Sequence, residues 1–157
     1  MMRGAVVSLH ICARAEEAMS SVPAVRAVPG EGLEGDRYHS RSGTYSKLGG
    51  SEREVTLIEE EAVDALRREY EVAFDAGDSR RNIVTRGVAL NHLVGREFRV
   101  GDVSLRGIRL CEPCGHIEKV TGQRIRAGLV HRGGLRAQIL TGGTIRAGDP
   151  IEPIEPK

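Results

Sequence analysis

Aromatic residues are scarce in this sequence, and so are cysteines and long apolar runs. The chain of 157 residues has no Trp, 2 Phe and 3 Tyr, which leaves few aromatic faces on which the bases of single-stranded nucleic acid could stack. Three cysteines are too few, and odd in number, for the disulfide framework of a secreted protein. No apolar run approaches the ~18 residues that a membrane-spanning helix needs. We therefore expect a cytoplasmic protein with reduced thiols that binds neither nucleic acid nor a membrane.

Lysine is nearly absent, and the arginines that take its place are unevenly distributed. The chain carries 20 Arg and 3 Lys, although its net charge is only +1. Residues 1–79 have nine basic and fifteen acidic side chains, residues 80–146 have thirteen and four, and residues 147–157 have one and three. A genome that favours arginine codons explains the ratio of Arg to Lys but not this segregation. A basic segment of this strength is typical of a surface that meets anions such as phosphate, another oxyanion or nucleic acid.

The pattern of apolar residues predicts a mainly β fold. Short alternating or β-branched segments recur along the chain between turns that contain Gly and Asp, which is typical of a β-barrel. Apolar residues at every fourth position predict one amphipathic helix over residues 59–70, and its leading glutamates suit the positive end of the helix dipole. The pair Gly142-Gly143 is a strong signal for a two-residue hairpin. We predict a single domain over residues 1–157, a closed β-barrel with a few peripheral helices, and strands at 5–11, 22–28, 54–58, 82–84, 97–100, 103–110, 135–140 and 144–151.

The motif Cys-Glu-Pro-Cys at residues 111–114 follows directly after the strand predicted at 103–110. A helix that begins at the proline would place Cys114 near its N-terminus, where the dipole and free N–H groups lower the pKa of a thiol. Cys114 is therefore the candidate catalytic thiolate, and a thiolate is also the form that binds soft metals. Cys12 is interpreted as a small core residue. A structural zinc site is an alternative, because tetrahedral Zn²⁺ needs four Cys or His ligands. The candidate ligands are Cys111, Cys114, His116 and His131.

Three short clusters combine arginine with oxygen-binding residues or with glycine. The planar fork of arginine matches phosphate and other oxyanions, and glycine lets backbone N–H groups approach a ligand closely. The first cluster lies in a glycine-rich loop predicted over residues 30–50, and a loop of this length is usually functional or mobile. The candidate cofactor-binding residues in the three clusters are Asp36, Arg37, Arg81, Asn82, His131, Arg132 and Gly133.

Together, these segments resemble the MOSC domain, the C-terminal domain of molybdenum-cofactor sulfurases. Residues 80–114 resemble the family's arginine-asparagine strand, its glycine-aspartate-valine turn and its cysteine-containing end. Residues 32–39 match the early G-D-[RK] motif, and residues 131–151 match the closing glycine-rich hairpin. The resemblance implies a strand-rich barrel associated with the molybdenum cofactor, or molybdopterin, in which Cys114 ligates molybdenum. It places Arg81 and Asn82 beside the cofactor, with four other candidates along the same cleft: Asp36, Arg37, His131 and Arg132.

The resemblance leaves two functions open. The chain either holds the molybdenum cofactor or carries sulfur for a metal–sulfur centre on Cys114, with a cysteine desulfurase or an electron-donor protein as its partner. Alternatively, it is a molybdenum-dependent reductase of N-hydroxylated compounds, as the amidoxime-reducing members of the family are. Its lysines are Lys47, Lys119 and Lys157, with no pyridoxal-phosphate domain around them, so we do not expect a complete cysteine desulfurase.

Overall fold

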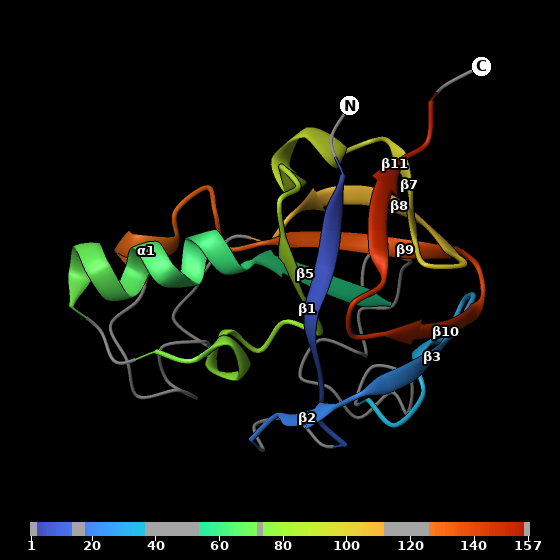
Figure 1. The fold of residues 1–157 in the computed structure, drawn as a ribbon, viewed down its shortest axis with the longest axis horizontal. Helices are drawn as coiled ribbons and strands as arrows, with labels where there is room; N and C mark the ends of the chain where they lie inside the picture. Colours follow the sequence, from blue (N-terminus) through green and yellow to red (C-terminus); the bar gives the residue numbers. More distant parts are fainter. Residues whose placement is uncertain (1–2, 14–17, 37–53, 72–73, 112–125, 156–157) are drawn as a thin grey trace.

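A computed structural model of the chain describes residues 3–13, 18–36, 54–71, 74–111 and 126–155. Within these residues, seven strands close into a barrel (Figure 1). β11 pairs antiparallel with β1, Gly4 lying opposite Ile151, and this pairing closes the ring. Every neighbouring pair is antiparallel except β5 and β6. In order around the barrel the strands are β11 (Pro150–Pro153), β7 (Glu97–Val100), β8 (Val103–Leu110), β9 (Leu135–Thr141), β5 (Val55–Glu59), β6 (Ile83–Arg86) and β1 (Gly4–Ile11), and β2 (Ser20–Val22) extends the sheet beyond β1.

The predicted fold class, a closed β-barrel with peripheral helices, is confirmed, but two predicted strands are each divided. Pro23 separates β2 from β3 (Ala24–Val28), because proline has no N–H to give to a sheet. A turn at residues 147–149 separates β10 (Gly143–Arg146) from β11. The chain thereby leaves the barrel to form a second small sheet in the order β10, β3 and β4 (Gly32–Leu33).

The hairpin predicted at Gly142-Gly143 is wrong. β9 and β10 belong to different sheets, and β10 pairs with β3. A Cβ atom at Gly142 would lie 2.8 Å from the carbonyl oxygen of Ala27. The glycine therefore allows the chain to approach the backbone of β3 closely. The sequence alone does not distinguish a glycine that serves such an approach from one that forms a hairpin turn. One of the turns that contain Gly and Asp does form a hairpin, because Val100 pairs with Val103 across Gly101-Asp102.

Two apolar clusters explain why consecutive residues of β5 are buried. Leu57 faces the inside of the barrel, and Ile58 faces outward beneath α1 (Glu60–Tyr70), where it packs with Val63 and Leu66. Burying each such side chain contributes about 1.5–3 kcal/mol. The predicted amphipathic helix is thus confirmed, and it begins one residue later than the periodicity indicates.

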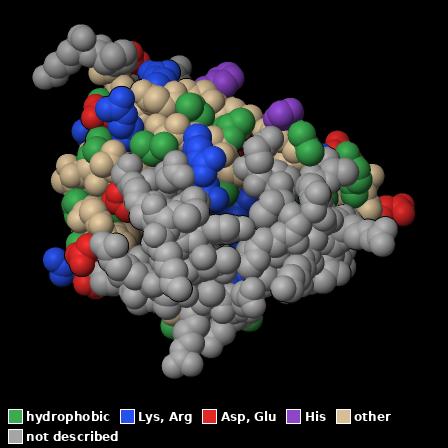
Figure 2. All heavy atoms as spheres, turned by 180° about the vertical axis from the view of Figure 1, so that it is seen from behind, with side chains coloured by type: hydrophobic (Ala, Val, Ile, Leu, Met, Phe, Trp, Pro, Cys, Tyr) green, Lys and Arg blue, Asp and Glu red, His purple; other side chains and the backbone are tan. Residues whose placement is uncertain are grey.

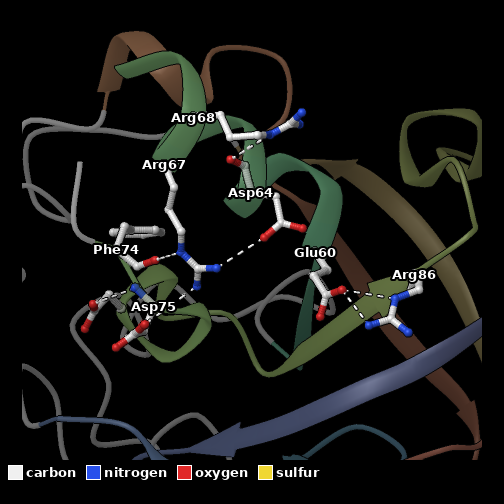
Figure 3. Close-up of polar contacts among 8 residues, drawn as sticks. Glu60, Asp64, Arg67, Arg68, Phe74, Asp75 and Arg86 are labelled. Carbon is white, nitrogen blue, oxygen red and sulfur yellow. Dashed lines mark hydrogen bonds and ion pairs between the residues drawn. The ribbon is translucent and has the colours of Figure 1, made fainter. Parts of the chain in front are cut away.

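The charged ends of α1 hold the chain segments beside them (Figure 3). Glu60 accepts hydrogen bonds from Nε and Nη2 of Arg86 at 3.0 Å and 2.7 Å. Its two glutamate neighbours, in the run 59–61, accept from the backbone N–H groups of residues 87 and 90. Near the other end of the helix, Arg67 donates to the carbonyl oxygen of Phe74. The leading glutamates therefore fix the segment after β6 in addition to meeting the positive end of the helix dipole.

Glu54 joins the small sheet to the barrel. Its buried carboxylate oxygen Oε1 accepts hydrogen bonds from the N–H groups of Gly30 at 3.0 Å and Ile139 at 3.2 Å. Burial raises the pKa of Glu54 because loss of water disfavours the carboxylate, and the two hydrogen bonds oppose this only in part. The folded chain therefore holds a proton at this position more tightly than the unfolded chain does.

We expect Glu54→Gln to flatten the dependence of stability on pH. In the wild type, the folded state binds more protons than the unfolded state once the pH passes the ordinary value of 4.5, so the free energy of unfolding falls until the pH exceeds the raised pKa. Glutamine keeps an oxygen acceptor for both N–H groups and has no proton to lose. Urea unfolding between about pH 4 and pH 8 measures the difference. Parallel pH profiles for the two proteins would contradict this account.

Candidate functional site

The end of β1 meets the segment that follows β4 at Cys12. The backbone N–H of Cys12 donates to Oδ1 of Asp36 at 3.0 Å, and Asp36 is fully buried. Nη2 of Arg80 donates to the sulfur of Cys12 at 3.9 Å. Arg80 is itself buried and has a φ of +62° at the end of the 3₁₀ helix η3 (Ala76–Ser79). Cys12 is buried, as predicted, and the structure brings the predicted residue Asp36 to the backbone N–H of Cys12.

Arg81 joins the end of β8 to the loop that precedes β9. Its Nε donates to the carbonyl oxygen of Gly133 at 2.8 Å, and its Nη2 donates to that of Cys111 at 3.1 Å. The N–H of Cys111 donates to the carbonyl oxygen of Gly134 at 2.7 Å. Arg81 is buried, so these carbonyl groups exchange water for a charged donor. Cys111, three residues before Cys114 in the sequence, therefore has a fixed position.

Gly134 permits this arrangement because it has no side chain. Its φ is +119°, and a Cβ atom there would lie 2.2 Å from the carbonyl oxygen of Leu57 and 3.4 Å from Nε of Arg81. Residues other than glycine rarely adopt this backbone conformation, and the close approach to β5 leaves no room for a side chain. The glycines of the His-Arg-Gly-Gly cluster thus serve packing and supply a carbonyl acceptor.

Asn82 connects β5, β6 and β1 on the outer face of the barrel. Its Oδ1 accepts from the N–H and hydroxyl of Thr56 at 3.1 Å and 3.2 Å, and its Nδ2 donates to the carbonyl oxygen of His10 at 3.1 Å. Asn82 is 1% exposed. Beside it, burial lowers the pKa of His10. The described contacts of Asn82 hold strands together, and its place beside a cofactor stays a prediction.

His131 and Arg132 contact other parts of the chain. Arg132 donates to Glu69 in α1 and to the carbonyl oxygen of Gly128 in α3 (Arg126–Leu129), both at 2.7 Å. The hydrogen bond from Arg132 lowers the pKa of Glu69. His131 is exposed, and its carbonyl oxygen accepts from Asn91 at 2.7 Å. The structure therefore brings Gly133 to Arg81, whereas the guanidinium of Arg132 binds between the two helices.

Three of the predicted residues, Arg37, Cys114 and His116, lie outside the described residues. Cys111 and Cys12 are buried free thiols. Among the residues that the structure describes, no group of three or more His, Cys, Asp and Glu side chains could hold a metal ion. Because two of its four residues, Cys114 and His116, lie outside the described residues, the zinc alternative stays a prediction.

Two arginines that the sequence analysis missed lie next to the fixed end of β8. Arg109 and Arg136 are direct partners across β8 and β9, one step along the ladder from the pair Leu110 and Leu135. Both belong to segments with an alternating pattern, which shows that one face is buried but not which residues of two strands meet. The charge count had indicated the segment 80–146 without indicating this pair.

The MOSC domain family model matches residues 44–152, which is more than half of the chain. The chain belongs to the MOSC domain family. Proteins of this family are associated with the molybdenum cofactor. A search of the curated proteins finds no match. The matched residues include Arg81, Asn82 and Cys114, so the family resemblance described above is confirmed as to family.

Solved structures share the fold at low sequence identity. The YUAD protein from Bacillus subtilis is 16% identical, with a TM-score of 0.81 over 99% of this chain and 98% of that one. YiiM from Geobacillus stearothermophilus is 14% identical, with a TM-score of 0.75 over 97% of this chain and 75% of that one. YiiM from Escherichia coli is 18% identical, with a TM-score of 0.68 over 100% of this chain and 71% of that one. At these identities the likeness shows the MOSC fold alone. No helix among the described residues is long and apolar enough to span a membrane.

Proposed function

We propose that this MOSC domain holds a molybdenum–pterin cofactor, or carries sulfur for one, through the thiolate of Cys114. The observation that carries the proposal is the anchoring of the strand end that leads to Cys114. Both the N–H and the carbonyl group of Cys111 are bonded, to Gly134 and to the buried guanidinium of Arg81. A reactive cysteine needs such a fixed start, because binding and transfer depend on placing the sulfur accurately.

The donor groups near this strand end suit an anionic, phosphate-bearing group better than a divalent cation. The guanidinium of Arg81 is bonded to this strand end, and Arg109 and Arg136 are cross-strand partners one step before it. Among the described residues, no group of three or more His, Cys, Asp and Glu side chains could hold a metal ion. Guanidinium groups bind phosphate through paired N–H donors. When bound, the molybdenum cofactor would supply a redox-active metal with sulfur ligands, and Cys114 would hold it.

As a sulfur carrier, the chain itself would perform one exchange. The Cys114 thiolate attacks the outer sulfur of a persulfide on a donor protein, and a new S–S bond forms. The donor's S–S bond breaks, its cysteine leaves as a thiolate, and Cys114 keeps the sulfur as a persulfide. A cysteine desulfurase is the class of protein that supplies such a donor, and an electron-donor protein is the partner if the metal remains bound. Both roles require the reduced thiols of a cytoplasmic protein.

Removing the Cys114 thiol tests the proposal. We expect the wild type, purified from cells that are supplied with molybdenum cofactor, to contain molybdenum and pterin, and Cys114→Ser to contain at least about tenfold less of both. Cys111→Ser is the matched control. Cys111 is the neighbouring buried free cysteine, and the hydrogen bonds described for it are made by its backbone N–H and carbonyl groups. If Cys114→Ser retained as much molybdenum as the wild type, the assignment of Cys114 would be wrong.

A further inference from the structure

An open cavity of about 280 Å³ lies where the turn before β7 meets β8 and the residue that follows β11. Its lining residues are Gly95, Arg96, Glu97, Arg106 and Ile154. Figure 2 shows both basic and acidic side chains at its upper left, the side on which β7, β8 and β11 lie in that view. The volume is close to the lower limit of small-molecule sites, about 300 Å³. None of the five residues belongs to the site described around Cys111.

Backbone hydrogen bonds fix the walls of this cavity. The N–H of Gly95 donates to the carbonyl oxygen of Gly107 at 2.8 Å, and the N–H of Gly107 donates to that of Arg96 at 2.9 Å. On the other side, the N–H of Ile154 donates to the carbonyl oxygen of Glu97 at 3.0 Å. At Gly95, where φ is +76°, a Cβ atom would meet nothing within 4 Å. The lining side chains therefore start from fixed points around an open space.

Two guanidinium groups and one carboxylate line the cavity. Glu97 and Arg106 are direct partners across β7 and β8, so their Cβ atoms lie about 5 Å apart on one face of the sheet. Both side chains are exposed, and Arg96 is half-buried. Within the part of the chain that the structure describes, no hydrogen bond or ion pair engages the charged groups of these three residues. A ligand can therefore contact all three groups without first breaking an interaction of the fold.

We propose that the cavity binds a free α-amino acid as its zwitterion, with the α-carboxylate at Arg96 and Arg106 and the α-ammonium at Glu97. Guanidinium groups match the planar carboxylate with paired N–H donors. A simple anion would meet the like charge of Glu97, and a simple cation would meet two guanidinium groups, whereas a zwitterion is complementary to both signs. Ile154 is half-buried and offers an apolar wall to an aliphatic side chain. This site is separate from the proposed function and does not depend on it.

Titration of the isotope-labelled protein with L-leucine, followed by NMR, tests the site. The backbone N–H signals of residues 95–97 and 154 are expected to shift, with a dissociation constant of about 1 mM. N-acetyl-L-leucine has no ammonium group, and L-leucinamide has no carboxylate. Each should bind about tenfold more weakly than L-leucine or worse, because each leaves one sign of charge in the cavity without a partner.

Substitutions of the lining residues identify which charge each group of the ligand meets. Glu97→Gln should weaken the binding of L-leucine about tenfold and leave that of N-acetyl-L-leucine unchanged, so that the preference for the free amino group disappears. Arg96→Gln should weaken the binding of both ligands. Arg99→Gln is the matched control, because it removes an exposed arginine of β7 that does not line the cavity, and it should bind L-leucine as the wild type does. Circular dichroism verifies that each variant is folded.

Three results would overturn the proposal. The first is the absence of shifts at residues 95–97 and 154 with L-leucine at up to about 50 mM. The second is equal weakening in Arg99→Gln and Arg96→Gln, which would show only a general effect of charge. The third is binding of N-acetyl-L-leucine as tight as that of L-leucine, with Glu97→Gln unchanged, which would identify a site for carboxylates and not for amino acids.

Discussion

Gly134→Ala is expected to lower the free energy of unfolding by about 4 kcal/mol or more. The added Cβ would lie 2.2 Å from the carbonyl oxygen of Leu57, which is backbone of a central strand and has little freedom to move. The φ of +119° adds the cost of a conformation that alanine avoids. Urea unfolding followed by circular dichroism measures the loss, since the chain has no Trp for fluorescence.

Gly148→Ala separates the two contributions to this loss. Gly148 also has a positive φ, +94°, but a Cβ there would meet nothing within 4 Å. Gly148→Ala should therefore lower the free energy of unfolding only by the cost of the strained backbone conformation, about 1–3 kcal/mol. Equal losses at the two positions would show that β5 and the 133–134 segment do not approach as closely as described.

Arg81→Met is expected to cost about 3 kcal/mol of stability, because two buried carbonyl groups lose a charged donor and methionine restores neither bond. The carbonyl groups belong to Cys111 and Gly133, so the loss would fall on the strand end that leads to Cys114. Thermal and urea unfolding measure it. Arg106→Met, at an exposed position of the same sheet, is the control and should change stability by no more than about 0.5 kcal/mol. If both substitutions cost the same, Arg81 would not anchor the strand end.

The sequence predicts the elements of this fold better than their partners. Alternation identifies β8, and period-four spacing identifies α1, because each element has one face in a core. The hairpin at Gly142-Gly143 fails because glycine serves a close approach to β3 as well as a turn. Pro23 and the turn at 147–149 divide two predicted strands, since alternation continues across both interruptions.

The site is predicted by residue type but not by contact. Arginine beside glycine indicated Arg81 and Gly133, which are bonded to each other across more than fifty residues of sequence. The same reasoning indicated Arg132, whose guanidinium instead links α1 and α3. Arg109 and Arg136 were missed because a bulge and a strand register bring them together, and a local pattern contains neither.

Elemental and mass analysis of the native protein tests the central claim, that Cys114 holds molybdenum or carries sulfur. We predict either molybdenum with pterin in the purified chain, or a peptide containing Cys114 that is heavier by about 32 Da, the mass of one persulfide sulfur. Zinc in place of molybdenum, together with an unmodified Cys114 peptide from protein produced with cofactor supply and a sulfur donor, would contradict the account.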